Sequence, residues 1–284
     1  MATKSQIKAF YDEIIRLRQQ EAWRPYEAYP VFLDYLQVES GRKLLDVGCG
    51  TGFLLKAAEA RGLFTYGIDI STEAVKIVKK VSPKSTIQVG DAENLCFHDK
   101  FFHYVTCLGS LEHFLDMRKA IREMVRVAKD EAKFCIVVPN INYLDWKIAK
   151  RRGRSVGTLQ QKIHENLLAM QEWMDLFAKK GLIIKEVHRD RWPVKQLQQR
   201  VTSLFYTNPL DLPKLLNLLI QRVKWLILPL KMTYQFVFIL KKRFPNDCSL
   251  KNLPFILEPQ RVLFRRDTKE EWVDGSTNTP FTVT

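Results

Sequence analysis

The chain has 284 residues, 46% of them hydrophobic, which is enough to form one large α/β domain with an insertion or with a small second domain. Its five cysteines are scattered and include no Cys-x-x-Cys pair, which argues against a disulfide framework and a zinc site. The net charge of +14 is concentrated in residues 146–284, which hold 25 Lys and Arg against 12 Asp and Glu, whereas residues 1–145 hold 20 against 19.

The first 40 residues are predicted to form an N-terminal helical lid. Residues 1–6 lack the apolar core of a signal peptide, so we expect a cytoplasmic protein. Residues 5–38 have apolar side chains at helical spacing, followed by aromatic residues around Pro25 and Pro30. This segment either covers a ligand site or packs against the edge of a sheet.

The most informative segment is residues 43–55, where an apolar run ends in a glycine-rich turn and an apolar helical pattern follows. This order is typical of the strand, ligand-facing loop and helix of a doubly wound α/β fold. Gly48, Gly50 and Gly52 form G-x-G-x-G rather than the dinucleotide pattern G-x-G-x-x-G, and no phosphate-binding Gly-Lys-Ser/Thr follows. Asp46, at the end of the strand, would repel a pyrophosphate but suits a ligand that carries positive charge.

Strands and helices alternate from residue 43 to residue 138. The patterns predict strands at 43–47, 64–69, 86–89, 103–108 and 133–138, and helices at 52–61, 72–80 and 116–128. Ser71 is the predicted N-cap of the second helix, and Asp130-Glu131 are predicted to form the turn before the fifth strand. Such alternation gives a parallel sheet that binds its ligand at the carboxyl ends of the strands, where Gly48, Asp69, Asp91 and Leu108 lie.

The chain beyond residue 139 is predicted to complete the fold around a long insertion. Lys147, Lys150, Arg151, Arg152 and Arg154 form either an anion-binding cluster or a solvated basic loop. A helix is expected at 166–179, a strand at 182–188 and the last strand at 260–265. These assignments give a core of residues 41–189 plus 258–267, a basic and apolar helical insertion at 190–257, and a polar tail at 268–284.

The insertion contains an amphipathic pattern at 214–228 and an almost wholly apolar run from Met232 to Leu240 that ends in three basic residues. Arg222, Lys224 and Lys231 make a bilayer-spanning helix unfavourable. We therefore expect 214–243 either to contact a membrane peripherally, on its inner surface, or to cap the fold.

Four sequence blocks at strand ends carry a resemblance to a known family. They are Asp46-Val47-Gly48-Cys49-Gly50-Thr51-Gly52, Gly67-Ile68-Asp69, Gly90-Asp91-Ala92-Glu93-Asn94-Leu95 and Tyr104-Val105-Thr106-Cys107-Leu108-Gly109-Ser110-Leu111-Glu112-His113-Phe114. In this order the blocks resemble the small-molecule class I S-adenosylmethionine-dependent methyltransferases, over roughly residues 40 to 140. The resemblance implies a Rossmann-like, seven-stranded doubly wound sheet and S-adenosylmethionine as the cofactor.

The resemblance also implies roles for individual residues. The loop Gly48–Gly52, which includes Cys49, would lie under the methionine and ribose of the cofactor, with Asp46 toward the methionine amino group. Asp69 would accept the ribose hydroxyls and Ile70 would pack on the adenine. Asp91 and the backbone of Ala92 would bind the adenine edge, and Leu108 and Gly109 would close the site.

His113 is the candidate catalytic base, because it follows the fourth strand and a histidine can take a proton from a hydroxyl group near neutral pH. The alternatives are a packing role for His113 and Glu112 as the base. No metal-ligand constellation is visible.

These features predict methyl transfer to a small molecule, a lipid or a lipid-linked glycan, with oxygen favoured as the methylated atom. One alternative is an RNA or protein methyltransferase that uses the basic second half to hold phosphates. Nucleic acid is disfavoured, because the block after the fourth strand lacks the Asn-Pro-Pro-Tyr type of sequence associated with base methylation. The other alternative is a non-catalytic protein that binds the cofactor.

Overall fold

The computed structural model describes residues 2–18, 24–153, 164–190 and 229–243, and the backbone of 264–265 and 272–273. The chain divides into two compact units, Met1–Pro245 and Asn246–Thr284. In the second unit, β8 (Phe264–Arg265) pairs antiparallel with β9 (Trp272–Val273). All that follows concerns the first unit.

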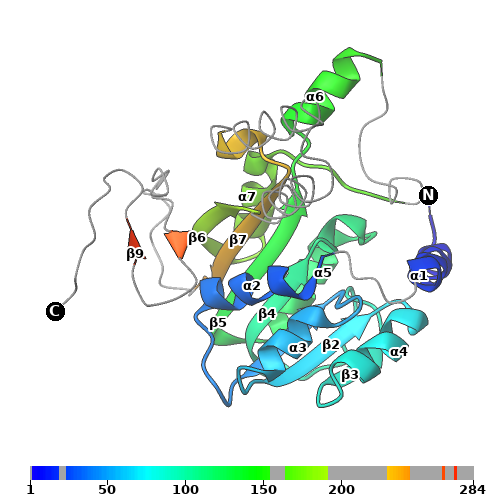
Figure 1. The fold of residues 1–284 in the computed structure, drawn as a ribbon, viewed down its shortest axis with the longest axis vertical. Coiled ribbons are helices and arrows are strands. Elements are labelled where there is room, and N and C mark those ends of the chain that lie inside the picture. Colours follow the sequence, from blue (N-terminus) through cyan, green and yellow to red (C-terminus); the bar gives the residue numbers. More distant parts are fainter. Residues whose placement is uncertain are drawn as a thin grey trace, which may run out of the picture. The chain divides into compact units, whose positions relative to one another are not determined.

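A seven-stranded sheet forms the centre of the first unit, with the strand order β3-β2-β1-β4-β5-β7-β6 (Figure 1). Its strands are β1 (Lys43–Val47), β2 (Phe64–Asp69), β3 (Thr86–Val89), β4 (Phe102–Leu108), β5 (Ala128–Pro139), β6 (Leu182–Arg189) and β7 (Gln235–Lys242). Strands β1 to β5 pair in parallel, and β7 runs antiparallel to both β5 and β6. This is the doubly wound α/β sheet that the sequence predicts.

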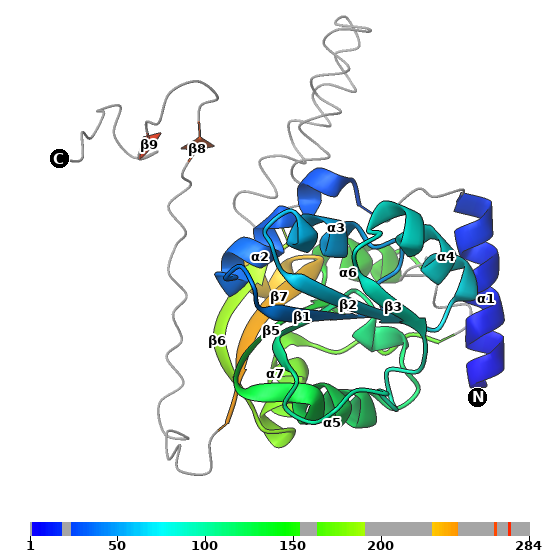
Figure 2. The ribbon, with the colours of Figure 1, turned by 90° about the horizontal axis from the view of Figure 1, so that it is seen from below.

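Helices cover both faces of the sheet (Figure 2). One face carries α2 (Pro30–Leu36), α3 (Phe53–Glu59) and α4 (Thr72–Val81), and the other carries α5 (Met117–Val127) and α7 (Met170–Lys179). The remaining described helices are α1 (Lys4–Arg18), which packs on α4, α6 (Leu144–Arg151), and the short 3-10 turns η1 (Tyr26–Ala28), η2 (Leu111–His113) and η4 (Leu230–Met232). Ser71 caps α4 as predicted, since its side chain accepts from the amide of Ala74 at 3.1 Å.

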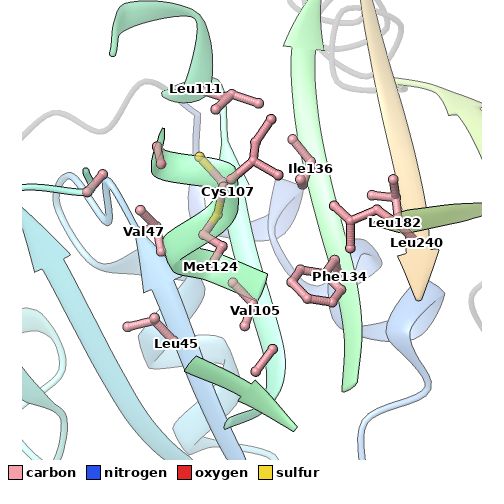
Figure 3. Close-up of a cluster of buried hydrophobic side chains, with 14 of the residues drawn as sticks. Leu45, Val47, Val105, Cys107, Leu111, Met124, Phe134, Ile136, Leu182 and Leu240 are labelled. Atoms are coloured by element: carbon pink, nitrogen blue, oxygen red, sulfur yellow. The ribbon is translucent and has the colours of Figure 1, made fainter. Parts of the chain in front are cut away.

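The core consists of two apolar layers, one on each face of the sheet. Figure 3 shows the layer under α5, where Met124 packs with Val105, Phe134 and Ile136 of the central strands. These side chains are fully buried, and removal of each from water stabilises the fold by about 1.5–3 kcal/mol. The central strands are therefore rigid supports for the loops that follow them.

The strand that completes the sheet is not the predicted one. We predicted residues 260–265 for this position, with an insertion at 190–257, but β7 comes from Gln235–Lys242 and lies between β5 and β6. Residues 264–265 pair instead with 272–273. The core thus includes 235–242, and the segment between β6 and β7 ends near Pro229–Met232 rather than at 257.

The apolar run from Met232 to Leu240 misled the sequence analysis because an inner strand is buried on both faces. Phe236, Val237, Phe238, Ile239 and Leu240 are all buried, so they show none of the alternation that marks a half-exposed strand. The side chains of 236–240 are thus covered by the protein itself. The amphipathic pattern at 214–228 lies outside the described residues.

Two smaller differences concern the ends of elements. Strand β5 begins at Ala128, so Asp130 and Glu131 lie within the strand and not in a turn before it. Helix α7 begins at Met170 rather than at 166. Within the described ranges, no helix is long and apolar enough to span a membrane.

Candidate functional site

A cavity of about 510 Å³ lies at the carboxyl ends of β1, β2 and β4, which is the edge that the parallel sheet predicts. Eleven of the twelve residues that the sequence singled out line it: Asp46, Gly48, Cys49, Gly50, Asp69, Ile70, Asp91, Ala92, Leu108, Gly109 and His113. Gly52 is the exception. The volume is within the range of about 300–1,000 Å³ that is typical of small-molecule sites.

The glycine loop brings the backbone of β1 close to β2 and β4. Gly48 has φ +71°, and a Cβ there would lie 2.5 Å from the hydroxyl of Ser110. Gly52 has φ +80° and begins α3, where a Cβ would lie 2.6 Å from Val78 of α4. Gly48 therefore lets Ser110 approach closely and Gly52 lets α3 and α4 pack closely, whereas at Gly50 a Cβ would meet nothing within 4 Å.

Asp69 is held rigidly at the end of β2. Its two carboxylate oxygens accept from the amides of Gly50 and Ser71, each at 2.8 Å, and its burial raises the pKa of the carboxyl group above the usual value. Each carboxylate oxygen can accept a second hydrogen bond. The side chain is thus oriented to receive hydroxyl donors from a ligand in the cavity.

Asp46 is also buried at the cavity wall. The hydroxyl of Thr106 donates to its Oδ1 at 2.7 Å, and burial raises the pKa of the carboxyl group to about 7. A nearby positive charge would favour the ionised form. This environment suits the cationic ligand that the sequence predicts for Asp46.

Asp91 follows β3 and is already engaged by helix α1. The amide of Glu93 donates to Asp91 Oδ1 at 2.9 Å, and the ammonium group of Lys4 contacts both carboxylates, lying 2.8 Å from Glu93. Lys4 is not among the site residues predicted from the sequence. Its only sequence signal is a position in the helix predicted to be a lid.

Helix α1 lines the cavity through Lys4, Ile7, Tyr11 and Ile15. It is held to the start of α4, where Asp12 Oδ1 accepts from the hydroxyl of Ser71 at 2.7 Å. Helix α1 lines the cavity, whereas α2 packs on the sheet. The lid predicted for residues 1–40 stays a prediction.

His113 and Glu112 lie side by side in η2, after β4. His113 Nδ1 lies 3.1 Å from the carbonyl oxygen of His164, which can only accept, so Nδ1 carries the proton. In the neutral ring Nε2 is then the acceptor, 3.8 Å from Glu112 Oε1. Burial raises the pKa of Glu112 to about 8. Both residues line the cavity, which fits a role in proton transfer.

Several lining residues come from distant segments that the sequence analysis did not connect with the site. Arg24 forms a buried ion pair with Asp190 at 2.6 Å and donates to Gln235 Oε1 at 2.6 Å. Trp146 and Tyr234 pack edge to face, with ring centroids 5.6 Å apart. Trp146 comes from α6 and Tyr234 immediately precedes β7.

The basic cluster after β5 lies outside the cavity lining. Lys147, Lys150, Arg151 and Arg152 are exposed to solvent, and none of them lines the cavity, while Arg154 lies outside the described residues. Across the described ranges, no group of His, Cys, Asp and Glu could hold a metal ion. The site is thus built from acids, glycines and aromatic rings.

Comparison with known proteins supports the resemblance stated above. The family profile described as "Methyltransferase domain" matches residues 45–136. An uncharacterized methyltransferase, YcgJ, of Bacillus subtilis is 24% identical over 63% of this chain and 72% of its own length. Ajmaline N-methyltransferase of Rauvolfia serpentina is 39% identical over 34% of this chain and 35% of its own length.

The similarity to other known proteins is partial or limited to the fold. The alignments span only 56% and 47% of two other curated relatives, about half of their length. The solved structure of the [4+2]-cyclase SpnF has a TM-score of 0.59 at 17% identity, covers 85% of this chain and 97% of its own, and shows the fold alone. Residues 45–136 match the methyltransferase-domain profile, and the curated relatives and the fold support a class I S-adenosylmethionine-dependent methyltransferase.

Proposed function

We propose that the protein transfers a methyl group from S-adenosylmethionine to a small-molecule acceptor bound in the same cavity. This proposal rests on the two sets of residues that line the cavity. One set of residues matches the cofactor contacts of the family, and a second set, Tyr11, Glu112, His113, Trp146 and Tyr234, leaves polar and aromatic groups for another molecule.

The residues present fit the cofactor. Gly50, with φ +51°, has open space where a Cβ would stand, and Asp69 has acceptor capacity beyond its two backbone hydrogen bonds. In this proposal Asp69 binds the ribose hydroxyls, Asp91 the adenine amino group and Asp46 the methionine amino group. The cofactor supplies a methyl group on a sulfonium, which is a strong electrophile, so the protein has mainly to bring a nucleophile into line with it.

The sequence favoured oxygen as the methylated atom and left nitrogen and carbon open. Curated relatives bear the names of O- and N-methyltransferases, and we propose an oxygen or a nitrogen. Nε2 of His113 is a candidate acceptor for the proton that either nucleophile must lose. The other predicted acceptors are a lipid and a lipid-linked glycan. These were inferred from the sequence pattern of residues 214–243, and 235–242 form an inner strand of the sheet.

The first test is calorimetric titration with S-adenosylmethionine and with S-adenosylhomocysteine. We expect affinity in the micromolar range or better. The second test supplies isotope-labelled cofactor with separate small-molecule, lipid, RNA and protein fractions of a cell extract. Label transferred to the small-molecule fraction supports the proposal. Label in RNA or protein would support the alternative acceptor class, and tight cofactor binding without transfer to any fraction would support a non-catalytic protein.

A further inference from the structure

Arg24 places a guanidinium group in the cavity wall, with its side chain only 12% exposed. Its Nη2 donates to Gln235 Oε1 at 2.6 Å, and its Nη1 lies 2.6 Å from Asp190 Oδ2. That ion pair lacks the alignment of a hydrogen bond, so Nη1 has no hydrogen-bond partner within the described ranges of the chain. Because a guanidinium group has five N–H donors and a buried donor without a partner is costly, Arg24 has donors left for a ligand in the cavity.

Gln235 places this guanidinium group near the end of β4. A Cβ built on Gly109, which follows β4, would lie 4.0 Å from Gln235 Nε2. The next residue, Ser110, donates through its hydroxyl to the carbonyl oxygen of Gly48 at 3.1 Å, in the glycine loop after β1. A short series of contacts therefore connects the glycine loop, the end of β4, the start of β7 and Arg24.

The order of the acids along the sheet gives the direction of the bound cofactor. Asp91 follows β3, Asp69 ends β2 and Asp46 lies in β1, and these strands are neighbours in the order β3-β2-β1-β4. In the proposed function these acids bind the adenine, the ribose and the methionine amino group in turn. The methionine carboxylate is bonded to the same carbon as that amino group, so it lies at the β1 and β4 part of the edge, which leads to Arg24.

Arg24 is also the basic side chain at the right end of the cavity. Among the described residues, the Lys and Arg side chains that line the cavity are Lys4 and Arg24. Lys4 contacts Asp91 and Glu93, at the adenine end. Asp46 would repel a carboxylate, so binding of the methionine carboxylate requires a cation beside it. A planar guanidinium group can bind one carboxylate along one edge and a second along another, so Arg24 can do this without leaving its ion pair.

We propose that Arg24 binds the carboxylate of the methionine part of the cofactor and makes the site select a cofactor with a complete amino-acid end. This inference rests on the proposed methyl transfer and adds to it a binding residue outside the four sequence blocks. Gln235 and Asp190 hold the guanidinium group in place from the two strands at the far side of the sheet. A carboxylate anchored by Arg24 fixes the methionine chain, and with it the sulfonium group from which the methyl group is transferred.

The test compares two ligands that differ only in the carboxylate. S-adenosylhomocysteine carries it, whereas its decarboxylated form, S-adenosyl-3-thiopropylamine, keeps the adenosine, the thioether and the amino group. Each ligand is titrated calorimetrically into the full-length protein. Because a hydrogen bond between charged groups is lost with the carboxylate, we expect wild-type protein to bind S-adenosylhomocysteine roughly ten-fold or more tightly than the decarboxylated form.

Matched variants assign this preference to Arg24. Arg24→Gln should reduce it to less than about three-fold, through weaker binding of S-adenosylhomocysteine. Arg24→Gln also removes the cation opposite Asp190, which can destabilise the fold, so the double variant Arg24→Gln/Asp190→Asn removes both charges and should show the same loss of preference. The control is Arg42→Gln, at a side chain 49% exposed, which should keep the wild-type preference.

The two ligands also separate this inference from the function on which it rests. If wild-type protein binds neither ligand, the proposed methyl transfer itself fails. If it binds both with equal affinity, the cofactor site stands and the assignment of Arg24 is wrong. A preference that survives in Arg24→Gln or in the double variant, or that is lost equally in Arg42→Gln, likewise overturns the assignment. Loss of the preference in the two Arg24 variants alone is the result we expect.

Discussion

Asp69 is the residue whose geometry most directly suits a cofactor contact, because two backbone amides orient its carboxylate. Replacement by alanine removes a charged acceptor for two hydroxyl groups. We expect Asp69→Ala to weaken binding of S-adenosylmethionine by about 1.5–3 kcal/mol. Calorimetry measures the change, with Asp34→Ala as the control at a carboxylate 63% exposed. Unchanged affinity in Asp69→Ala would refute the site assignment.

His113 is a candidate base whose tautomer is set by the carbonyl of His164. If Nε2 of His113 takes the proton that the methylated molecule loses, His113→Ala should reduce turnover by roughly 10²–10⁴ while the affinity for the cofactor changes little. Steady-state rates and calorimetry separate the two effects. The exposed His98→Ala serves as the control. Full turnover with a normal pH profile in His113→Ala would leave positioning alone as its mechanism.

Glu112 should make the protein less stable as the pH rises. Burial raises the pKa of its carboxyl group from 4.5 to about 8, so between these pH values the folded protein binds more protons at this site than the unfolded chain does. The free energy of unfolding therefore falls with increasing pH across this window. We expect Glu112→Gln to melt at a higher temperature than wild type at pH 8.5 and at a similar temperature at pH 4.5.

Differential scanning calorimetry at a series of pH values measures this difference. Glu39→Gln, at an exposed position, should show no such pH dependence. A melting temperature of Glu112→Gln that follows the wild type at every pH would mean that the carboxyl group of Glu112 is ionised without cost in the folded protein. Such a stabilising effect of Glu112→Gln is expected if Glu112 is kept for function at the expense of stability.

Strand β7 can be tested as an element of the core. Phe238 is fully buried and packs against Phe177 and Phe236. Phe238→Ala should lower the free energy of unfolding by about 3–5 kcal/mol. Denaturant titration measures this, and Leu17→Ala, at a side chain 71% exposed, should change it by less than about 0.5 kcal/mol. A surface-like effect of Phe238→Ala would contradict the placement of 235–242 in the sheet.

Features of the fold and site that depend on local sequence were predicted, and features that depend on long-range contacts were not. The glycine loop and the acids Asp46, Asp69 and Asp91 were predictable because each follows its own strand within a few residues, and parallel strands bring their ends together. The order in which β7 enters the sheet was not predictable, because a continuous apolar run is compatible with a buried strand or a buried helix.

The second set of residues that lines the cavity could not be predicted from the sequence, for the same physical reason. Tyr11 and Arg24 are separated from Tyr234 by more than two hundred residues, and only the folded chain brings them to one wall. No local pattern marks an aromatic residue in a helical stripe as a ligand contact. Glu112 was visible in the sequence, but its burial and its unpartnered Oε2 were not.

At the scale of the whole molecule, the outstanding feature is the charge excess of residues 146–284, which hold 25 basic and 12 acidic residues. Part of this excess is exposed in and after α6, at Lys147, Lys150, Arg151 and Arg152, beside Ile148, which is 37% exposed. Trp146, in the same helix, lines the cavity. The sequence predicts peripheral membrane contact through 214–243; contact through α6 instead would bring an anionic surface close to the site.

This prediction is tested by sedimentation with liposomes. Each basic residue near an anionic surface contributes about 1 kcal/mol, and salt screens the attraction, so we expect binding to anionic but not to neutral vesicles, and its loss at high salt. Replacement of Lys147, Lys150, Arg151 and Arg152 by glutamine should weaken binding. The same replacement of the exposed Lys76, Lys79, Lys80 and Lys84 removes equal charge from the other half of the chain and should not. If wild-type protein stays in the supernatant with anionic vesicles at low salt, the basic excess serves another purpose and the acceptor reaches the cavity from solution.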